Sequence, residues 1–297
     1  MNKSKDTSRR NAIKKMAGSA AVAVAGMSLS HRLSAAEAVL DEKLKGKVNH
    51  SVCRWCYQEI PFEDLCKAAN QIGITSIELI GPDEWPIAKK YGLTCAMPNG
   101  AGKGLEYGFN DLALHDELIK SYTDIIPNVA AAGLKQIICF SGNRRGLADE
   151  KGIENCAIGI KKLIPIAEKH KVILSMELLN SRVDHPDYQC DHSAWGIELC
   201  DRVGSDYFKL LYDIYHMQIM EGDIIATIKK YHTYFSHYHT GGVPGRHEID
   251  ESQEINYPAI IKAIVETGYT GFVAQEFFPK PADKLAALKQ GVLICDV

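Results

Sequence analysis

The sequence predicts an α/β protein built as a single (β/α)8 TIM barrel, and three observations support this fold class. Short runs rich in β-branched and aromatic residues alternate with longer helical patterns from residue 48 to the end of the 297-residue chain. Eight such strand–helix units are found, and eight units in about 250 residues match the size of this barrel. No segment rich in Pro, Gly and Ser divides the units, so we expect one barrel domain over 39–297.

The expected elements follow from hydrophobic periodicity, with a period of two for strands and of 3.6 for helices. The expected strands lie at 49–55, 75–80, 92–97, 135–141, 171–177, 208–213, 234–239 and 271–276. The expected helices lie near 61–72, 84–91, 115–133, 151–170, 192–203, 221–231 and 257–268, with a last one near 281–290.

Local signals mark several helix ends. Pro61 can begin the first helix, and Gly73 and Gly133 can end the first and the third. The alternative fold, an open doubly wound sheet, would usually show a glycine-rich phosphate loop after its first strand. Segment 53–57 reads Cys-Arg-Trp-Cys-Tyr and contains no glycine, so the sequence favours the barrel.

Residues 1–38 have the three parts of an export signal. A basic head contains Arg9 and Arg10, an uncharged run of small and apolar residues follows at 16–30, and 36–38 reads Ala-Glu-Ala. Paired arginines before a weakly hydrophobic run are typical of the twin-arginine type. We expect a signal peptide and an exported, periplasmic protein with no stable membrane span after cleavage. The alternative interpretation of this segment is a buried amphipathic helix.

Composition and charge exclude several classes of protein. With 46% hydrophobic and 24% charged residues, the chain is neither disordered nor collagenous nor a coiled coil. Cleavage after Ala38 would remove seven basic and two acidic residues and leave 27 Lys+Arg against 35 Asp+Glu, a net charge of −8. Such a chain would repel phosphate backbones, so we expect no nucleic acid as a partner.

All nine cysteines lie after residue 38, and an odd number excludes a complete disulfide framework. Cys53 and Cys56 have the spacing of a redox pair, but they lie where an expected strand runs into a loop. A thioredoxin-type pair opens a helix instead, so we interpret most of the cysteines as packing residues.

Four consecutive expected strands end in residues that can bind a metal ion. In a barrel the carboxyl ends of the strands meet at one mouth. Three carboxylates so close together would repel one another unless a cation lay among them. Three carboxylates and one imidazole, without a thiolate, suit one divalent ion, with Mn²⁺ or Mg²⁺ preferred and Co²⁺ or Zn²⁺ as alternatives. Each residue alone could instead cap a helix or lie at a solvated rim. The four residues are Glu177, Asp213, His239 and Glu276.

Further polar residues lie near the expected mouth. His216 follows Asp213 by three residues and can donate a hydrogen bond to a substrate oxygen, or else cap the next helix. Arg246 lies in a Gly/Pro-rich loop, where a guanidinium can bind a carboxylate or a pair of hydroxyls, or else form a salt bridge at the rim. Glu78 faces inward at the end of the second strand, and we interpret it as a buried structural partner. Asn180 and His247 are weaker candidates.

These residues resemble the xylose-isomerase-like barrels, and within them the hydroxypyruvate isomerases and their relatives, the ketose 3-epimerases. The resemblance spans roughly residues 50–280, and the stretches 242–248 and 254–258 are more similar to hydroxypyruvate isomerases than to epimerases. It implies that the four strand-end residues hold one divalent metal ion and that Glu177 and Glu276 also act as the acid/base pair. His239 departs from the hydroxypyruvate isomerases, which often have Gln at this position, and agrees with the epimerases. The resemblance is densest at 177–180, 211–217, 237–248, 254–258 and 275–276.

The sequence therefore predicts a metal-dependent isomerase, an intramolecular oxidoreductase of the aldose–ketose type. It would interconvert a small hydroxycarbonyl compound through an enediolate, with hydroxypyruvate to tartronate semialdehyde as the best single guess. The main alternative is a ketose 3-epimerase or another isomerase of free sugars. Export favours free sugars or keto-sugar derivatives, because hydroxypyruvate is normally metabolised in the cytoplasm.

Two functions of other classes remain as alternatives. A non-catalytic sugar-binding protein would not require two glutamates beside a metal ion, and a DNA-repair endonuclease on the related barrel would need more zinc ligands and a basic groove. Barrels of this kind often form homo-oligomers. The true substrate, the native metal and the oligomeric state stay open at this stage.

Overall fold

The computed structural model describes residues 43–297. The expected signal peptide at 1–38, with its cleavage and export, lies outside the described residues. Residues Lys45–Val297 form one compact unit. Over the described range, every helix is too short or too polar to span a bilayer.

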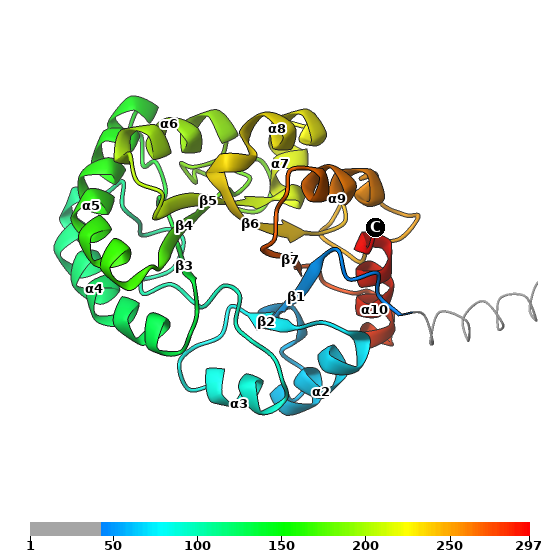
Figure 1. Ribbon diagram of the computed structural model, residues 1–297. Coiled ribbons are helices and arrows are strands. Elements are labelled where there is room, and N and C mark those ends of the chain that lie inside the picture. Colours follow the sequence, from blue (N-terminus) through cyan, green and yellow to red (C-terminus); the bar gives the residue numbers. More distant parts are fainter. Residues whose placement is uncertain (1–42) are drawn as a thin grey trace, which may run out of the picture. The chain divides into compact units, whose positions relative to one another are not determined.

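A curled parallel sheet forms the inner ring of this unit, and helices surround it (Figure 1). The sheet has seven strands in the order β2-β1-β7-β6-β5-β4-β3, and all neighbouring pairs are parallel. The predicted TIM-barrel fold is confirmed. The strands are β1 (Asn49–Cys53), β2 (Ser76–Glu78), β3 (Gln136–Cys139), β4 (Ile173–Glu177), β5 (Phe208–Asp213), β6 (Phe235–Thr240) and β7 (Phe272–Gln275).

The expected strand at 92–97 differs from the others, because it forms only an isolated bridge between Thr94 and Ser76. The backbone N–H of Ile77 still donates to Thr94 O at 3.0 Å, so the segment lies beside β2. The N–H of Ala96 donates to the Ser76 hydroxyl at 2.8 Å, and its carbonyl accepts from the Gln136 side chain of β3. Backbone bonds thus join this segment to β2 and a side-chain bond joins it to β3, so an irregular segment fills the place of the eighth strand.

The helices agree with most of the expected ranges. Gly73 ends α2 in the left-handed conformation that glycine adopts without strain (φ 98°). The α-helices are α2 (Phe62–Ile72), α3 (Trp85–Lys90), α4 (His115–Ala131), α5 (Asp149–His170), α6 (Ser193–Val203), α7 (Ile214–Met220), α8 (Ile224–Tyr231), α9 (Tyr257–Glu266) and α10 (Lys284–Cys295). Short 3-10 helices lie at η1 (Arg54–Tyr57), η2 (Leu112–Leu114) and η3 (His232–Tyr234).

Helix α7 is an element that the sequence did not predict. It begins directly after β5, and the Asp213 carboxylate caps it by accepting the backbone N–H of His216 at 3.1 Å. The expected helix at 221–231 corresponds to α8 alone, and α7 precedes it. Because no loop separates β5 from α7, Asp213 and His216 both stay at the carboxyl end of the sheet.

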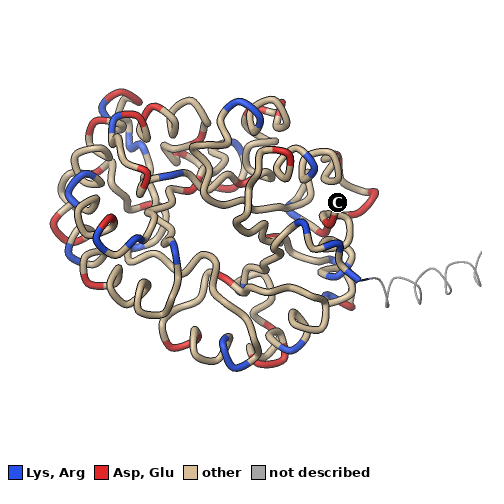
Figure 2. Tube along the Cα trace, in the orientation of Figure 1, with Lys and Arg blue, Asp and Glu red and all other residues tan. Residues whose placement is uncertain are grey.

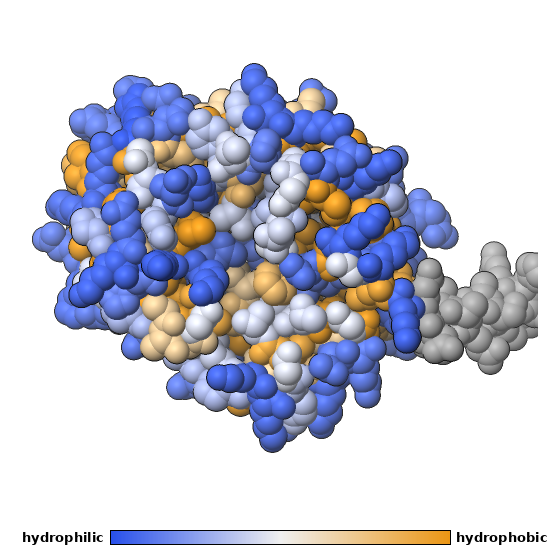
Figure 3. All heavy atoms as spheres, viewed as in Figure 1, coloured by the Kyte–Doolittle hydropathy of each residue, from blue (hydrophilic) through white to orange (hydrophobic). Residues whose placement is uncertain are grey.

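The surface mixes both signs of charge. Figure 2 shows Lys and Arg interspersed with Asp and Glu along the surrounding helices, without a face of one sign. Hydrophilic residues cover most of the face in Figure 3, and hydrophobic residues are visible between them in separate patches. Inside the barrel Met97, Ile138 and Leu211 form an apolar cluster, against which Leu79 and Phe140 pack. This cluster lies beneath the residues of the mouth.

Candidate active site at the carboxyl ends of the strands

The four predicted metal ligands come together at one place. Glu177 and Asp213 are the last residues of β4 and β5, His239 lies one residue before the end of β6, and Glu276 directly follows β7. One ligand atom from each lies within 4.8 Å of the others, and all four residues are buried. The parallel register explains this, because Asp213 pairs with His239 across β5 and β6.

The Nδ1 atom of His239 lies among the three carboxylates. It is 2.9 Å from Glu276 Oε2, 3.3 Å from Glu177 Oε1 and 4.0 Å from Asp213 Oδ2. Lone pairs of nitrogen and oxygen at these distances repel each other, so this place requires a positive charge, either a proton on Nδ1 or a metal ion.

Two carboxylate oxygens at the same place have no hydrogen-bond partner. They are Glu177 Oε1 and Asp213 Oδ2, and both are buried. A buried unpaired carboxylate oxygen is costly, and a divalent cation bound by oxygen ligands would remove that cost. Three carboxylates and one imidazole are therefore a donor set that fits a hard or borderline divalent ion.

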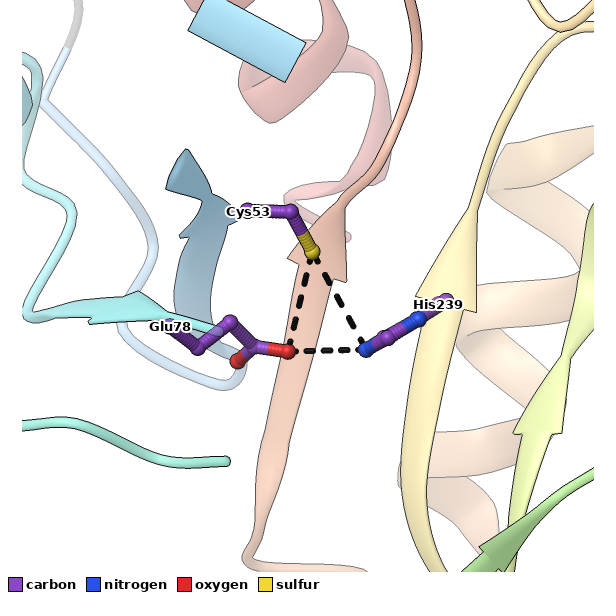
Figure 4. A group of neighbouring side chains, drawn as sticks. All are labelled: Cys53, Glu78 and His239. Atoms are coloured by element: carbon purple, nitrogen blue, oxygen red, sulfur yellow. Dashed lines mark hydrogen bonds and ion pairs between the residues drawn. The ribbon is translucent and has the colours of Figure 1, made fainter. Parts of the chain in front are cut away.

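Glu78 orients His239 from the opposite side of the ring (Figure 4). Its Oε1 atom lies 2.8 Å from Nε2 of His239 and 2.9 Å from Nε2 of His237. All three side chains are fully buried. Burial alone would raise the pKa of Glu78, but the two histidines lower it to about 2, so the carboxylate stays ionised and accepts hydrogen bonds.

The amide of Gln136 fixes the tautomer of His237. Its Nε2 donates to the carbonyl of Ala96 at 3.0 Å and lies 3.2 Å from Nδ1 of His237. Nδ1 of His237 therefore accepts, and its Nε2–H donates to Glu78. His239 likewise donates its Nε2–H to Glu78, which leaves Nδ1 of His239 directed at the carboxylates. A ligating histidine usually donates its other N–H to a carboxylate or carbonyl in this way.

Cys53 completes a second group of metal-type side chains, with Sγ 3.8 Å from Glu78 Oε1 and 4.0 Å from His239 Nε2 (Figure 4). Burial raises the pKa of the Cys53 thiol well above its ordinary value, which favours the uncharged form. The thiol can donate weakly to Glu78. Cys53 and Cys56 are both free and buried, as are the other seven cysteines of the described chain.

Glu276 accepts hydrogen bonds from two side chains. Trp55 of η1 donates its indole N–H to Oε1 at 2.7 Å, and Arg246 donates to Oε2 at 2.6 Å. The Arg246 guanidinium also lies 3.7 Å from Asp213 Oδ2 and stacks between the rings of Trp55 and Tyr215, at 5.0 and 5.3 Å. Its charge is thus offset by two carboxylates.

His216 lies beside Asp213. Its Nδ1 accepts from the side chain of Asn180 at 2.6 Å, so the ring proton is on Nε2. That Nε2 lies 3.6 Å from Asp213 Oδ2 and has no hydrogen-bond partner, although it is fully buried. Asn180 therefore orients a free donor toward the site. His247, by contrast, is partly exposed, and its Nδ1–H donates to Phe278 O at 3.1 Å.

Electrostatics separates the two glutamates. Burial raises the pKa of Glu177 above its ordinary value, and it raises the pKa of Asp213 well above. Burial acts on Glu276 in the same direction, but the positive charges of His239 and Arg246 outweigh it, and its pKa is well below the usual range. The two carboxyl groups thus differ in their affinity for a proton.

The site opens into a cavity of about 560 Å³. Glu177, Glu276 and Arg246 line it, and so do His185 and Trp55. The loop at 99–105 forms the other rim and lies directly on β3, since a Cβ atom at Gly100 would be 2.6 Å from Ile138 O. The site is therefore accessible to a small molecule.

The sequence did not single out Trp55, His185 or the role of Glu78 toward His239. Trp55 lies between two cysteines and carried no motif of its own. Glu78 was interpreted as a buried structural partner, and the structure gives that partner an identity, the pair His237 and His239. His237 and His239 are two residues apart in β6, and because side chains alternate along a strand with a period of two, this spacing indicates that both lie on the same face.

Known proteins resemble this chain over most of its length. A family model described as "Xylose isomerase-like TIM barrel" matches residues 66–293. The chain belongs to this family. The 2-oxo-tetronate isomerase of Pectobacterium atrosepticum is 27% identical over 239 residues, which cover 75% of this chain and 89% of that protein.

Two further proteins are similar to this chain. The hydroxypyruvate isomerase of Escherichia coli is 30% identical over 151 residues, which are 50% of this chain and 58% of that protein. A crystal structure described as an AP endonuclease, family 2, from Brucella melitensis has a TM-score of 0.72 at 25% identity and covers 82% of this chain and 97% of that one. The predicted likeness to hydroxypyruvate isomerases is confirmed.

Proposed function

We propose that this member of the xylose isomerase-like family is a metal-dependent isomerase of small hydroxycarbonyl compounds. The observation that supports it most directly is the arrangement of Glu177, Asp213, His239 and Glu276 around one point at the edge of an open cavity. The names of the relatives agree with this reaction class.

Glu177, Asp213, His239 and Glu276 would hold the divalent ion, because the unpaired oxygens of the first two lie near Nδ1 of His239, as does Oε2 of Glu276. Bound there, the ion would supply Lewis-acid stabilisation of negative charge on neighbouring oxygens. Mn²⁺ and Mg²⁺ suit the oxygen-rich donor set best, with Co²⁺ and Zn²⁺ as alternatives.

The two glutamates would move the proton. One carboxylate removes a proton from the carbon next to the carbonyl, and the electron pair of that C–H bond becomes the C=C bond of an enediolate. The hydroxyl proton of the neighbouring carbon passes to the former carbonyl oxygen, a carboxyl group returns a proton to the former carbonyl carbon, and a new carbonyl forms at the neighbouring carbon. Glu177 and Glu276 line the same cavity and can both reach such a substrate.

His216 and Arg246 would orient the substrate oxygens. The Nε2–H of His216 and the Nε–H of Arg246 are buried donors without partners, so each can donate to a hydroxyl or carbonyl oxygen. Each role depends on one N–H donor and not on the charge of the residue.

The test is removal and restoration of the metal. Protein that lacks residues 1–38 is dialysed against a chelator, single metals are restored, and solvent-deuterium exchange at carbon is measured on hydroxypyruvate and on small ketoses. We expect exchange only after Mn²⁺, Mg²⁺, Co²⁺ or Zn²⁺ is added. Equal exchange by the chelated and the restored protein would contradict metal dependence, and no exchange in any sample would contradict the isomerase.

A ketose 3-epimerase is the second candidate. It is favoured by His239 at the position where hydroxypyruvate isomerases often have Gln, and by a cavity that both glutamates line. Product analysis separates the two: an epimerase inverts one carbon of a ketose, whereas an isomerase moves the carbonyl.

We also propose that the protein is exported, on the basis of Arg9, Arg10 and the run that follows them. Residues 1–38 fused to a reporter should carry it out of the cytoplasm, and the double variant Arg9→Lys, Arg10→Lys should keep it inside. Unchanged export of the double variant would indicate a general secretory signal.

A further inference from the structure

Part of the cavity wall is apolar. Ile138 and Leu179 are buried there, whereas Leu79, Leu105 and Phe140 keep part of their surface exposed. Partly exposed apolar side chains that face a concave site are available to an apolar part of a ligand, whose binding would remove them from water.

Leu79 reaches this wall at an energetic cost. Its backbone is in the left-handed region (φ 57°), and its N–H donates to Met97 O at 2.7 Å. This conformation costs a non-glycine residue about 1–2 kcal/mol, and glycine would adopt it without strain. The chain therefore has a leucine, with its apolar side chain, at a position where the backbone conformation favours glycine.

The cavity offers little to an anion. Of the described residues that line it, Arg246 is the one Lys or Arg. Its charge is already offset by Glu276 at 2.6 Å and by Asp213 at 3.7 Å. With a divalent ion bound among the three carboxylates, a substrate carboxylate would find its balancing charge at the ion and not at an unpaired cation of the protein.

The cavity is also larger than a three-carbon acid requires. At about 30 Å³ per non-hydrogen atom, the share of a water molecule in the liquid, such an acid would fill roughly 200 Å³. The cavity measures about 560 Å³. By the same measure a hexose of about 12 non-hydrogen atoms fills roughly 360 Å³ and a disaccharide of about 23 fills roughly 690 Å³, so a second ring would fill the rest of the cavity and extend past its rim.

We propose that the substrate is an uncharged hydroxycarbonyl sugar that carries a second ring. This inference rests on the proposed function for the reacting end, which would lie at Glu177 and Glu276. The second ring would lie between the loop at 99–105 and Phe140, with its carbon-bound face against Leu79, Leu105 and Phe140. Its hydroxyls would stay directed at the solvent and at the backbone of the glycine-rich loop.

The test compares three probes on the metal-loaded protein. They are hydroxypyruvate, D-fructose, and isomaltulose, which is fructose with a glucose ring on its O6. Dissociation constants are measured by calorimetry, and deuterium exchange at carbon is measured in parallel. We expect isomaltulose to bind roughly tenfold more tightly than fructose, and hydroxypyruvate to bind most weakly.

Variants of Leu105 locate the effect, because this residue lies in a surface loop where substitution leaves the core intact. Leu105→Ser should lower the isomaltulose preference over fructose to about threefold or less. Leu105→Lys should strengthen the binding of hydroxypyruvate and not of isomaltulose. The matched control is Leu112→Ser, since Leu112 is 49% exposed and lines a different cavity. It should keep the wild-type preference.

The outcomes separate the two proposals. Equal binding of isomaltulose and fructose, or tightest binding of hydroxypyruvate, would overturn the inference about the substrate class. Exchange on any probe would then still support the isomerase. Preferred binding of isomaltulose with no exchange on any probe would support the substrate class and overturn the reaction.

Discussion

The two halves of the barrel mouth differ in chemistry although their residues occupy equivalent positions. Strands β4 to β7 end in Glu177, Asp213, His239 and Glu276. The half formed by β1 to β3 ends in Cys53, in Leu79 directly after β2, and in Phe140 directly after β3. Hydrogen bonds and charges fix the first half, and apolar packing on the barrel interior fixes the second. The half formed by β4 to β7, the polar half, can thus carry out a reaction. The half formed by β1 to β3, the apolar half, can select the substrate.

Glu78 shows that the division is not strictly by strand. It belongs to β2, one residue before the apolar Leu79, yet its carboxylate crosses the barrel to His237 and His239 of β6. The apolar half therefore also contributes the acceptor that orients a ligand of the polar half. The strand ends at Glu78, and the left-handed backbone of Leu79 (φ 57°) breaks the side-chain alternation, so both side chains can lie inside the barrel.

The largest effect is expected from a change within the polar half. Glu276→Gln keeps an oxygen for the metal and removes the proton acceptor, so turnover should fall by roughly 10²-fold or more. Metal affinity should fall only modestly. Deuterium-exchange rates and metal titration of the same samples measure the two effects, with the exposed Glu251→Gln as the matched control. Turnover within threefold of wild type would remove Glu276 from the acid/base pair.

A smaller effect is expected from Glu78, and it concerns metal affinity. Glu78→Gln keeps the shape but weakens the acceptor that holds Nε2–H of His239, so metal affinity should fall by about 10–100-fold. Titration with Mn²⁺ measures this without any assay of activity. Cys53→Ala is the control, because it removes only the weak S–H donor to Glu78 and leaves the bonds of Glu78 to both histidines intact.

The same pair of variants tests whether Cys53 and Glu78 bind an ion of their own. One ion per chain in wild type and in Cys53→Ala would support a positioning role for Glu78. Two ions in wild type and one in Cys53→Ala would contradict it.

The sequence predicted the polar half better than the apolar half, for a physical reason. Strand period and strand order fix which residues reach the mouth, so Glu177, Asp213 and His239 could be found from local patterns. The hydrogen bond from Trp55 to Glu276 joins residues 221 positions apart, and no local pattern contains it. The apolar wall depends on the loop at 99–105, whose path follows from tertiary contacts such as that of Gly100 with β3. The strand predicted at 92–97 forms only an isolated bridge, because side-chain bonds, such as that from the Ala96 N–H to the Ser76 hydroxyl, hold part of this segment.

Trp55 joins the two halves, and its variant is expected to have the smallest effect of the three. It follows β1, but its indole N–H donates to Glu276 at 2.7 Å. Trp55→Phe removes that donor and keeps an aromatic ring against Phe278, at 4.9 Å, and beneath the Arg246 guanidinium. Because Arg246 and His239 still hold the other oxygen of Glu276, the carboxylate keeps its place and loses one charge-assisted hydrogen bond.

A hydrogen bond to a charged group contributes about 1.5–3 kcal/mol, and part of it would be replaced by water in the open cavity. We therefore expect exchange rates in Trp55→Phe to fall by roughly tenfold with unchanged metal affinity. Trp85→Phe is the matched control, since its indole donates to Ile80 O outside the site. A loss in Trp55→Phe as large as that in Glu276→Gln would show that the apolar half takes part in the reaction itself. The division between a reacting half and a selecting half would then be wrong.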